Sequence, residues 1–138
     1  MYLLDTNIIS ELRRLGRVDR HVAAWAQTAE PATLFLSVIT ALEIEIGWRR
    51  IARRDQPQGD RLRAWMERQV LPAFDGRILP VSLAVVRRCA PLHVPDPRPD
   101  RDSLMAATAL VHDLILVSRN VADFAGTGVR LVNPFEPL

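Results

Sequence analysis

Four carboxylates in this chain stand where an apolar run ends or inside an otherwise apolar helix: Asp5, Glu43, Asp102 and Asp123. We therefore expect all four near or inside the packed body. An ionised carboxylate that leaves water loses on the order of several kcal/mol, so it needs an arginine, a helix end or a shared cation as partner. The four lie roughly one strand–helix unit or more apart, as a cleft at the carboxyl ends of parallel strands requires. This pattern supports a divalent-metal site as the first hypothesis.

Asp5 directly follows the apolar run 2–4, at a place where open α/β sheets often carry site residues. The alternative role for Asp5 is the N-cap of the next helix. Thr6 and Asn7 can cap that helix equally well, so we favour a functional role for Asp5.

Glu43 shares one stripe of an apolar helix with Thr40, Gly47 and Arg50. Glycine costs a helix about 1 kcal/mol, yet one turn after a carboxylate it opens space for a ligand. The alternative is a structural salt bridge from Glu43 to Arg50 or Arg13.

For Asp102 and Asp123, a purely structural role explains the sequence about as well as a role in a functional site. Asp102 opens a helix rich in alanine, where it can act as the N-cap, although Asp100 can do so instead. Asp123 follows a buried strand and lies in the first turn of a segment that Asn120 can cap. Ser118 and Asn120 add neutral polar groups at the same strand end.

The composition limits the classes of function that the chain can have. The chain has 138 residues, a net charge of +2 and 49% hydrophobic residues, which is typical of a soluble globular protein. All 18 basic residues are arginine, which excludes lysine Schiff bases and the lysine of a phosphate-binding loop. No apolar run approaches the ~20 residues that span a bilayer. A lone Cys89 suits a reducing compartment, so we expect the cytoplasm and no membrane association.

Short apolar runs alternate with helical periodicity along the whole chain, which predicts an α/β fold: one domain over residues 1–138, a three-layer α/β/α sandwich on a mostly parallel sheet. We expect strands at 2–4, 33–37, 78–81, 114–117 and 129–132, and helices at 8–14, from Asp19 to Pro31, 39–53, 62–70, 83–90 and 103–112. The segments 55–60 and 91–100 read as a polar turn and a proline-rich connection.

Together these residues resemble the PIN-domain nucleases, and most closely the VapC-type toxins of bacterial toxin–antitoxin pairs. The resemblance covers almost the whole chain. It rests on four motifs in order: Leu-Leu-Asp5-Thr-Asn7-Ile-Ile-Ser, Leu-Ser-Val-Ile-Thr40-Ala-Leu-Glu43-Ile-Glu-Ile-Gly47, Asp102-Ser-Leu-Met-Ala-Ala-Thr-Ala and Leu-Val-Ser118-Arg-Asn120-Val-Ala-Asp123-Phe. The departures are small: serine at position 118, an extra acid at Glu45 and the proline-rich 91–100.

The resemblance implies a PIN-like domain with Mg²⁺- or Mn²⁺-dependent endoribonuclease activity. All-oxygen ligands suit these ions. We expect Asp5 and Asp102 as direct ligands, with Glu43 and Asp123 completing the shell. The residues expected to position substrate or the Asp123 loop are Asn7, Ser118 and Asn120.

The resemblance also implies partners: an RNA substrate, a homodimer and a cognate VapB-type antitoxin, with a higher toxin–antitoxin assembly as a further option. We expect the antitoxin in a groove lined by Ile8, Ile9 and Leu12. The arginines at the end of the Glu43 helix, Arg49, Arg50 and Arg53, are either RNA-backbone contacts or a solvated face.

Other classes fit less well. A phosphatase or phosphoacceptor domain also clusters aspartates at strand ends, but it normally needs a lysine. A non-catalytic PIN-like module would lack the acids. A DNA-directed or structure-specific PIN nuclease and a non-toxin RNA-processing nuclease remain as alternatives.

Overall fold

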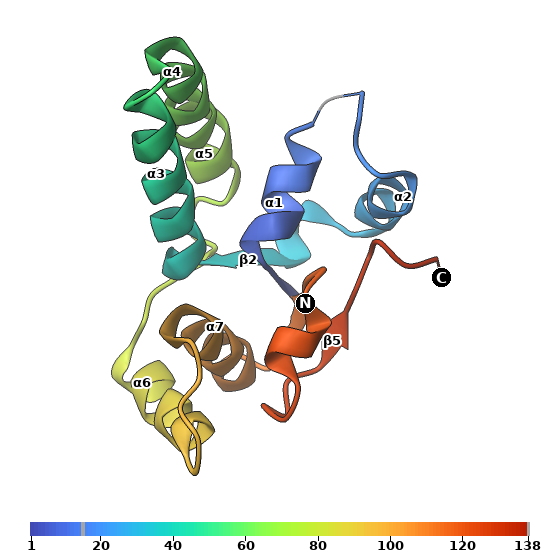
Figure 1. The fold of residues 1–138 in the computed structure, drawn as a ribbon. Helices are drawn as coiled ribbons and strands as arrows, with labels where there is room; N and C mark the ends of the chain where they lie inside the picture. The colour runs from blue at the N-terminus through green and yellow to red at the C-terminus, as the bar shows by residue number, and fades with distance from the viewer. Residues whose placement is uncertain (15, 138) are drawn as a thin grey trace.

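The computed structural model describes residues 1–14 and 16–137. Its centre is a five-stranded sheet in the order β3-β2-β1-β4-β5, in which every neighbouring pair is parallel. The strands are β1 (Tyr2–Leu4), β2 (Leu34–Ser37), β3 (Ile78–Leu79), β4 (Ile115–Val117) and β5 (Leu131–Val132). β1 lies in the middle, so the chain leaves it toward β2 on one side and β4 adjoins it on the other (Figure 1).

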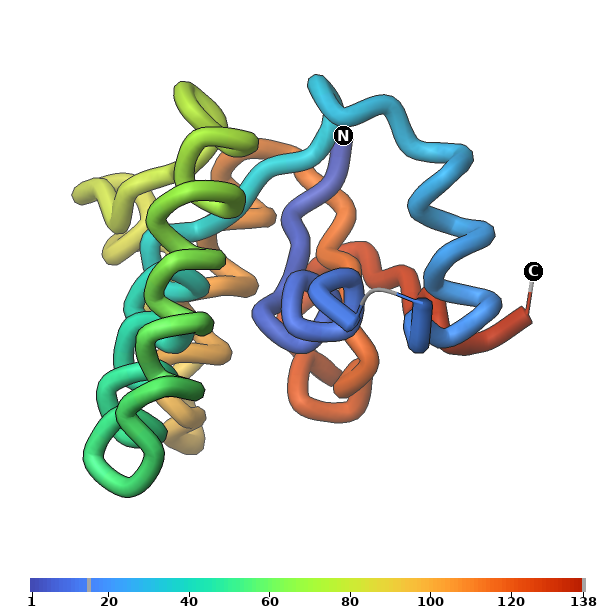
Figure 2. The backbone as a smooth tube through the Cα atoms, turned by 90° about the horizontal axis from the view of Figure 1, so that it is seen from above, coloured from blue at the N-terminus to red at the C-terminus, as the bar shows by residue number. Residues whose placement is uncertain are grey.

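Helices fill the connections between the strands. They are α1 (Thr6–Leu12), α2 (Arg20–Thr28), α3 (Val38–Ala52), α4 (Gln56–Trp65), α5 (Leu71–Ala73), α6 (Leu83–Cys89) and α7 (Asp100–Val111). Short turns of other helix types are η1 (Pro31–Thr33), η2 (Met66–Val70, a π turn that joins α4 to α5), η3 (Ala90–His93) and η4 (Val121–Phe124). The hairpin of α3 with α4 lies at one end of the molecule and α2 at the other (Figure 2). Among the described residues, no helix is long and apolar enough to cross a membrane.

The strand register divides the core between the two faces of the sheet. Leu4 pairs with Val117, and both belong to the cluster that packs with α1, α2 and α3. The preceding pair, Leu3 with Leu116, belongs to the second cluster, which packs with α7. Successive side chains of a strand point to opposite faces of the sheet, so each apolar strand contributes side chains to both clusters. The predicted α/β/α sandwich on a parallel sheet is confirmed.

Several element ends differ from the prediction for identifiable reasons. The polar segment at 55–60 is not a turn: Asp55 accepts a hydrogen bond from the backbone N–H of Gln58 and starts α4 there. β3 ends at Leu79 because Pro80 has no N–H for a further ladder bond. α7 begins at Asp100, three residues earlier than expected. Asp19 caps α2 as its sequence position predicted, accepting from the backbone N–H groups of His21 and Val22.

α3 and α4 pack so closely that one position in their contact admits only hydrogen as a side chain. A methyl group placed on Gly59 would lie 2.5 Å from Cβ of Ala52 and 2.6 Å from its Cα. Since backbone atoms form part of this contact, a rotamer change cannot relieve it. The position fixes the spacing of the hairpin, and the hairpin in turn fixes the direction of α3, which carries Glu43.

We expect Gly59→Ala to destabilise the protein by about 1–3 kcal/mol through overpacking. Gly47→Ala is the matched control, because in the described part of the chain its methyl group would meet open space. That control should be neutral or stabilising by up to about 1 kcal/mol through helix propensity. Urea unfolding of both variants measures the difference, and equal stabilities would contradict the close contact.

Candidate functional site

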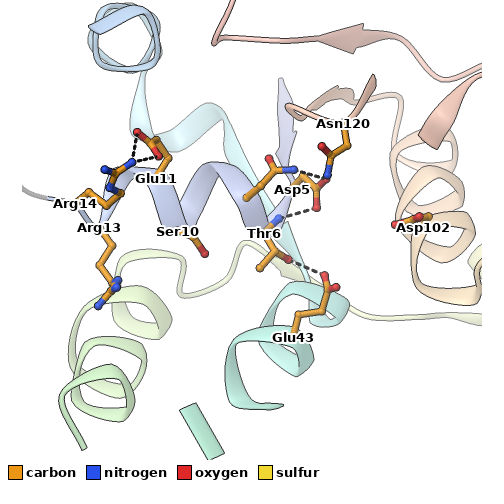
Figure 3. Close-up of a pocket in the computed structure, with 10 residues that line it drawn as sticks. Asp5, Thr6, Ser10, Glu11, Arg13, Arg14, Glu43, Asp102 and Asn120 are labelled. Carbon is orange, nitrogen blue, oxygen red and sulfur yellow. Dashed lines mark hydrogen bonds and ion pairs between the residues drawn. The ribbon is translucent and has the colours of Figure 1, made fainter. Parts of the chain in front are cut away.

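A pocket of about 570 Å³ opens at the carboxyl edge of β1 and β4. Asp5, Glu43 and Asp102 reach it from three separate elements, the end of β1, the middle of α3 and the first turn of α7 (Figure 3). The remaining lining residues are Thr6, Asn7, Ser10, Glu11, Arg13, Arg14 and Asn120. Three of the four predicted acids therefore face one space, although they are 38 and 59 residues apart along the chain.

Asp5 is held by several hydrogen bonds at once. Its Oδ1 accepts from the backbone N–H of Thr6 at 2.7 Å, which makes Asp5 the N-cap of α1. Its Oδ2 accepts from the hydroxyl of Ser118 at 2.7 Å and from the amide of Asn7 at 3.2 Å. The expectation that Thr6 and Asn7 cap this helix was wrong, because both lie inside it. Asp5 thus combines the capping role with a place in the pocket.

Burial raises the pKa of Asp5 above its usual range. The hydrogen bonds from Ser118, Thr6 and Asn7 oppose this rise, while the charge of Asp123 adds to it. The fold therefore keeps a carboxylate in a partly desolvated place, where the donors in the described residues that stabilise its charge are neutral groups.

Ser118 positions Asp5 and has no access to a substrate. The residue is fully buried, and its Oγ donates to Asp5 while it accepts from Asn7 at 3.3 Å and from the backbone N–H of Asn120 at 3.0 Å. The Oδ1 of Asn7 accepts in turn from the backbone N–H of Arg119 at 3.2 Å. Of the two roles predicted for Ser118, these contacts favour holding the Asp123 loop, because Asn120 begins the turn that carries Asp123, and burial does not favour contact with substrate. Asn7 and Asn120 do line the pocket.

Glu43 has partners other than the arginines considered from the sequence. Its Oε1 accepts from the hydroxyl of Thr6 at 2.7 Å, and that hydroxyl also lies 3.1 Å from the buried Thr40 hydroxyl. Its Oε2 lies 3.7 Å from Nη1 of Arg101. Glu43 is thus tied to α1 and to α7, and the alternative of a bridge to Arg50 or Arg13 is replaced by these contacts.

Asp102 lies in the first turn of α7, one residue after Arg101. Within the described chain, no side chain caps this helix, so the capping alternatives for Asp102 and Asp100 are wrong. Burial raises the pKa of Asp102, and the negative charges of Asp123, Asp5 and Glu43 raise it further. The three other acids are therefore close enough to repel it.

Asp123 lies apart from the pocket wall. It is exposed in the first turn of η4, where sequence analysis expected it, and its backbone N–H donates to the carbonyl of Asn120. Its charge nevertheless raises the pKa of both Asp5 and Asp102. Asp123 therefore stands at the edge of the acid group.

The four acids offer only oxygen donors, and their mutual repulsion is the electrostatic condition that a hard divalent cation relieves. In the described residues, no three histidine, cysteine, aspartate or glutamate side chains stand close enough together to hold an ion directly. Glu43 is drawn toward Thr6 and Arg101, and Asp123 lies at the edge. This spacing fits a hydrated Mg²⁺ or Mn²⁺, whose water ligands bridge to carboxylates.

The other predicted residues fall into three groups. Arg49 pairs with Glu45 at 2.7 Å and lies over the ring of Trp48, whereas Arg50 and Arg53 are exposed near the end of α3. Ile9 and Leu12 line an apolar pocket of about 190 Å³. Ile8 is fully buried in the core, so its predicted place in a surface groove is corrected.

Sequence reasoning missed three residues that organise the site: Thr6, Thr40 and Arg101. Thr6 directly follows Asp5, and Thr40 precedes Glu43 by three residues. From the sequence alone, each resembles an ordinary residue of a helix or of its cap. Arg101 lies between Asp100 and Asp102, and in this segment only the two acids were considered as candidates. Ser10 was also missed, and Arg13 was considered only as a salt-bridge partner of Glu43; both line the acid pocket and an apolar pocket beside it.

Comparison with known proteins gives consistent relatives. The family model of the PIN domain matches residues 2–128. A VapC ribonuclease from Sinorhizobium fredii is 35% identical, with 99% of each chain covered. The crystal structure of FitAcB from Neisseria gonorrhoeae superposes with a TM-score of 0.87 at 30% identity over 99% of each chain. A toxin–antitoxin complex from Klebsiella pneumoniae superposes with a TM-score of 0.70 at 29% identity over 100% of each chain.

The raised pKa of Asp102 predicts a pH-dependent effect of its removal. Because the folded-state pKa is raised, ionisation of Asp102 weakens the fold as pH rises from about 4 through that raised pKa. In EDTA, Asp102→Asn should therefore be more stable than wild type at pH 7, and this gain should shrink toward pH 4.

Asp100→Asn is the matched control for this prediction. It removes an exposed carboxylate from the same first turn of α7 and so loses the same favourable interaction with the helix dipole. Urea unfolding at pH 4 and pH 7 compares the variants. A gain for Asp102→Asn that is the same at both pH values, or equal to that of Asp100→Asn, would contradict the crowding of like charges.

Proposed function

The chain belongs to the PIN domain family, and from this premise we propose that it is a VapC-type toxin, a Mg²⁺- or Mn²⁺-dependent endoribonuclease of the bacterial cytoplasm. We propose that it acts as a homodimer and that a separate antitoxin controls it. The observation that carries the proposal is the convergence of Asp5, Glu43 and Asp102 on one pocket at the carboxyl edge of the sheet.

The role that we propose for each residue follows from the contacts that hold it. Asp5 is fixed by Ser118, Asn7 and the start of α1, so it presents a carboxylate of constant direction. Asp102 approaches from α7 and is the second direct ligand in this proposal. A bound divalent cation would supply the acidity that activates a water and the positive charge that offsets the phosphodiester in the transition state.

Glu43 and Asp123 complete the arrangement from opposite sides. Glu43 is oriented by the Thr6 hydroxyl, so it can accept a proton from a water that lies in the pocket. Asn120 lines the pocket, and Asp123 lies outside its wall at the edge of the acid group, where we expect a phosphate of the RNA backbone to approach. Arg50 and Arg53 are exposed farther along α3 and suit the same backbone through charge.

The antitoxin site that we propose is an apolar groove made of two adjoining pockets. One, of about 190 Å³, is lined by α1, β2 and the segment from Trp65 to Phe74; the other, of about 220 Å³, lies between α1, α3 and α4. Both share Arg13 and Trp65. An apolar helix in this groove would gain affinity through buried area.

The groove also leads to the acids. Ser10 and Arg13 line both the second apolar pocket and the acid pocket. A basic tail that follows the apolar helix can therefore reach Glu43 and Asp102 and compete with the cation for their carboxylates. This continuity supports inhibition by a single partner that fills the groove and caps the site.

Exposed apolar side chains on α3 and α6 support a second copy of the chain as the other partner. They are Val38 and Leu42 on α3, and Leu83 and Val86 on α6. These four side chains are 37–74% exposed, and a homodimer that covered α3 and α6 would remove them from water.

Asp102→Asn should lower RNA cleavage by at least about 100-fold while the protein stays folded, because the loss of a direct ligand removes several kcal/mol of charge stabilisation, by rough estimate. Asp100→Asn should cleave like wild type. EDTA should stop the wild-type reaction, and Mg²⁺ or Mn²⁺ should restore it.

The products of the same assay test the mechanism. Attack by water gives 5′-phosphate and 3′-hydroxyl ends, whereas attack by the 2′-hydroxyl gives a cyclic 2′,3′-phosphate. Cyclic products, or cleavage that survives exhaustive chelation, would overturn the metal mechanism. Preference for DNA of the same sequence would instead favour a DNA-directed PIN nuclease.

The partner proposal predicts that Leu12→Asp and Ala73→Arg abolish binding of the protein encoded by the neighbouring upstream frame. Leu12 and Ala73 both line the apolar groove, and Ala73 is exposed, so its replacement blocks the groove without burying a charge in the core. Val94→Asp is the control, since that exposed valine follows η3, outside the groove and outside the apolar faces of α3 and α6. Pull-down and growth on co-expression measure the effect; if both groove variants still bind, the partner docks elsewhere.

A further inference from the structure

Arg101 is the cation that contacts the acid group in the described structure. Its Nη1 lies 3.7 Å from Oε2 of Glu43, and it is the following residue, Asp102, that faces the same pocket. The positive charge of Arg101 also favours the ionised form of Asp102. One side chain thus partly neutralises two of the acids.

The contact is loose enough to open. The side chain of Arg101 is 48% exposed and that of Glu43 is 30% exposed, and 3.7 Å is long for a direct charged hydrogen bond. Ion pairs of this kind contribute little to stability and are replaced by water at small cost. The other oxygen of Glu43 keeps its 2.7 Å bond from Thr6, so the carboxylate stays oriented when Arg101 leaves.

We propose that Arg101 exchanges partners during the reaction: it neutralises Glu43 in the resting protein, and it passes to a phosphate of the RNA when a divalent cation at the acids would offset the charge of Glu43 in its place. The inference rests on the proposed function. A planar guanidinium matches phosphate oxygens in two parallel hydrogen bonds. Arg101 is half exposed and contacts Glu43, which lines the pocket, so its guanidinium is accessible to a phosphate beside the acids.

Arg101→Gln should strengthen Mn²⁺ binding and weaken RNA cleavage. A positive charge several ångströms from a divalent cation repels it, so its removal should tighten Mn²⁺ binding by about tenfold. The same change removes the phosphate contact, so single-turnover RNA cleavage at saturating Mn²⁺ should fall by about tenfold or more. A merely structural residue would not tighten metal binding when it is lost.

The experiment titrates Mn²⁺ into the full chain without RNA, following free Mn²⁺ by electron paramagnetic resonance, and then measures cleavage for each variant. Arg101→Lys keeps the charge and loses the planar fork, so Mn²⁺ affinity should stay within about twofold of wild type while cleavage falls. Arg61→Gln, an exposed arginine on α4, is the control for the loss of one positive charge and should leave both quantities unchanged.

Unchanged Mn²⁺ affinity in Arg101→Gln, or unchanged cleavage, would overturn the partner exchange. Failure of the proposed function looks different: the wild-type protein would then neither bind Mn²⁺ nor cleave RNA. A wild type that does both, with Arg101→Gln identical to it, refutes this inference alone.

Discussion

The repulsion among carboxylates at the carboxyl edge of β1 and β4 is the constraint on which the rest of the structure depends. Three negative charges act on Asp102, and one of them also acts on the more buried Asp5. Such a group is stable only if each charge has a fixed donor or a mobile counter-ion. The fold provides neutral donors at Asp5 and Glu43, and Arg101 adds a positive charge beside Glu43.

The neutral donors come from residues that are themselves locked in place. Ser118 is buried at the end of β4 and holds Asp5 at the end of β1, so the hydrogen bond crosses between two paired strands. Thr6 holds Glu43 and is in turn bonded to the buried Thr40, which links α1 to α3. The sheet register and the helix packing therefore set the positions of the acids, and a shift of either element would move a carboxylate.

The sequence predicted the sheet and the acids because both depend on local patterns. Apolar runs that end in a polar residue mark parallel strands, and Asp5 and Ser118 stand at two such ends. The contacts that decide roles join residues 34 to 113 positions apart, such as Thr6 with Thr40 and Ser118 with Asp5. No local pattern encodes these pairings. For that reason the bond from Ser118 to Asp5 was not predicted, Ile8 was assigned to a surface groove, and Arg101 was overlooked.

The acid pocket and the apolar groove are joined through Arg13 and Ser10, and this junction connects catalysis with control. Arg13 lines all three pockets, and its guanidinium lies 5.6 Å from the ring centre of Trp65, in the wall that the two apolar pockets share. A partner that fills the groove must contact or displace this cation, which also lines the acid pocket. Under the proposed function, occupation of the groove and entry of RNA would therefore compete for one side chain, and a partner would need to cover only the groove and its rim to stop cleavage.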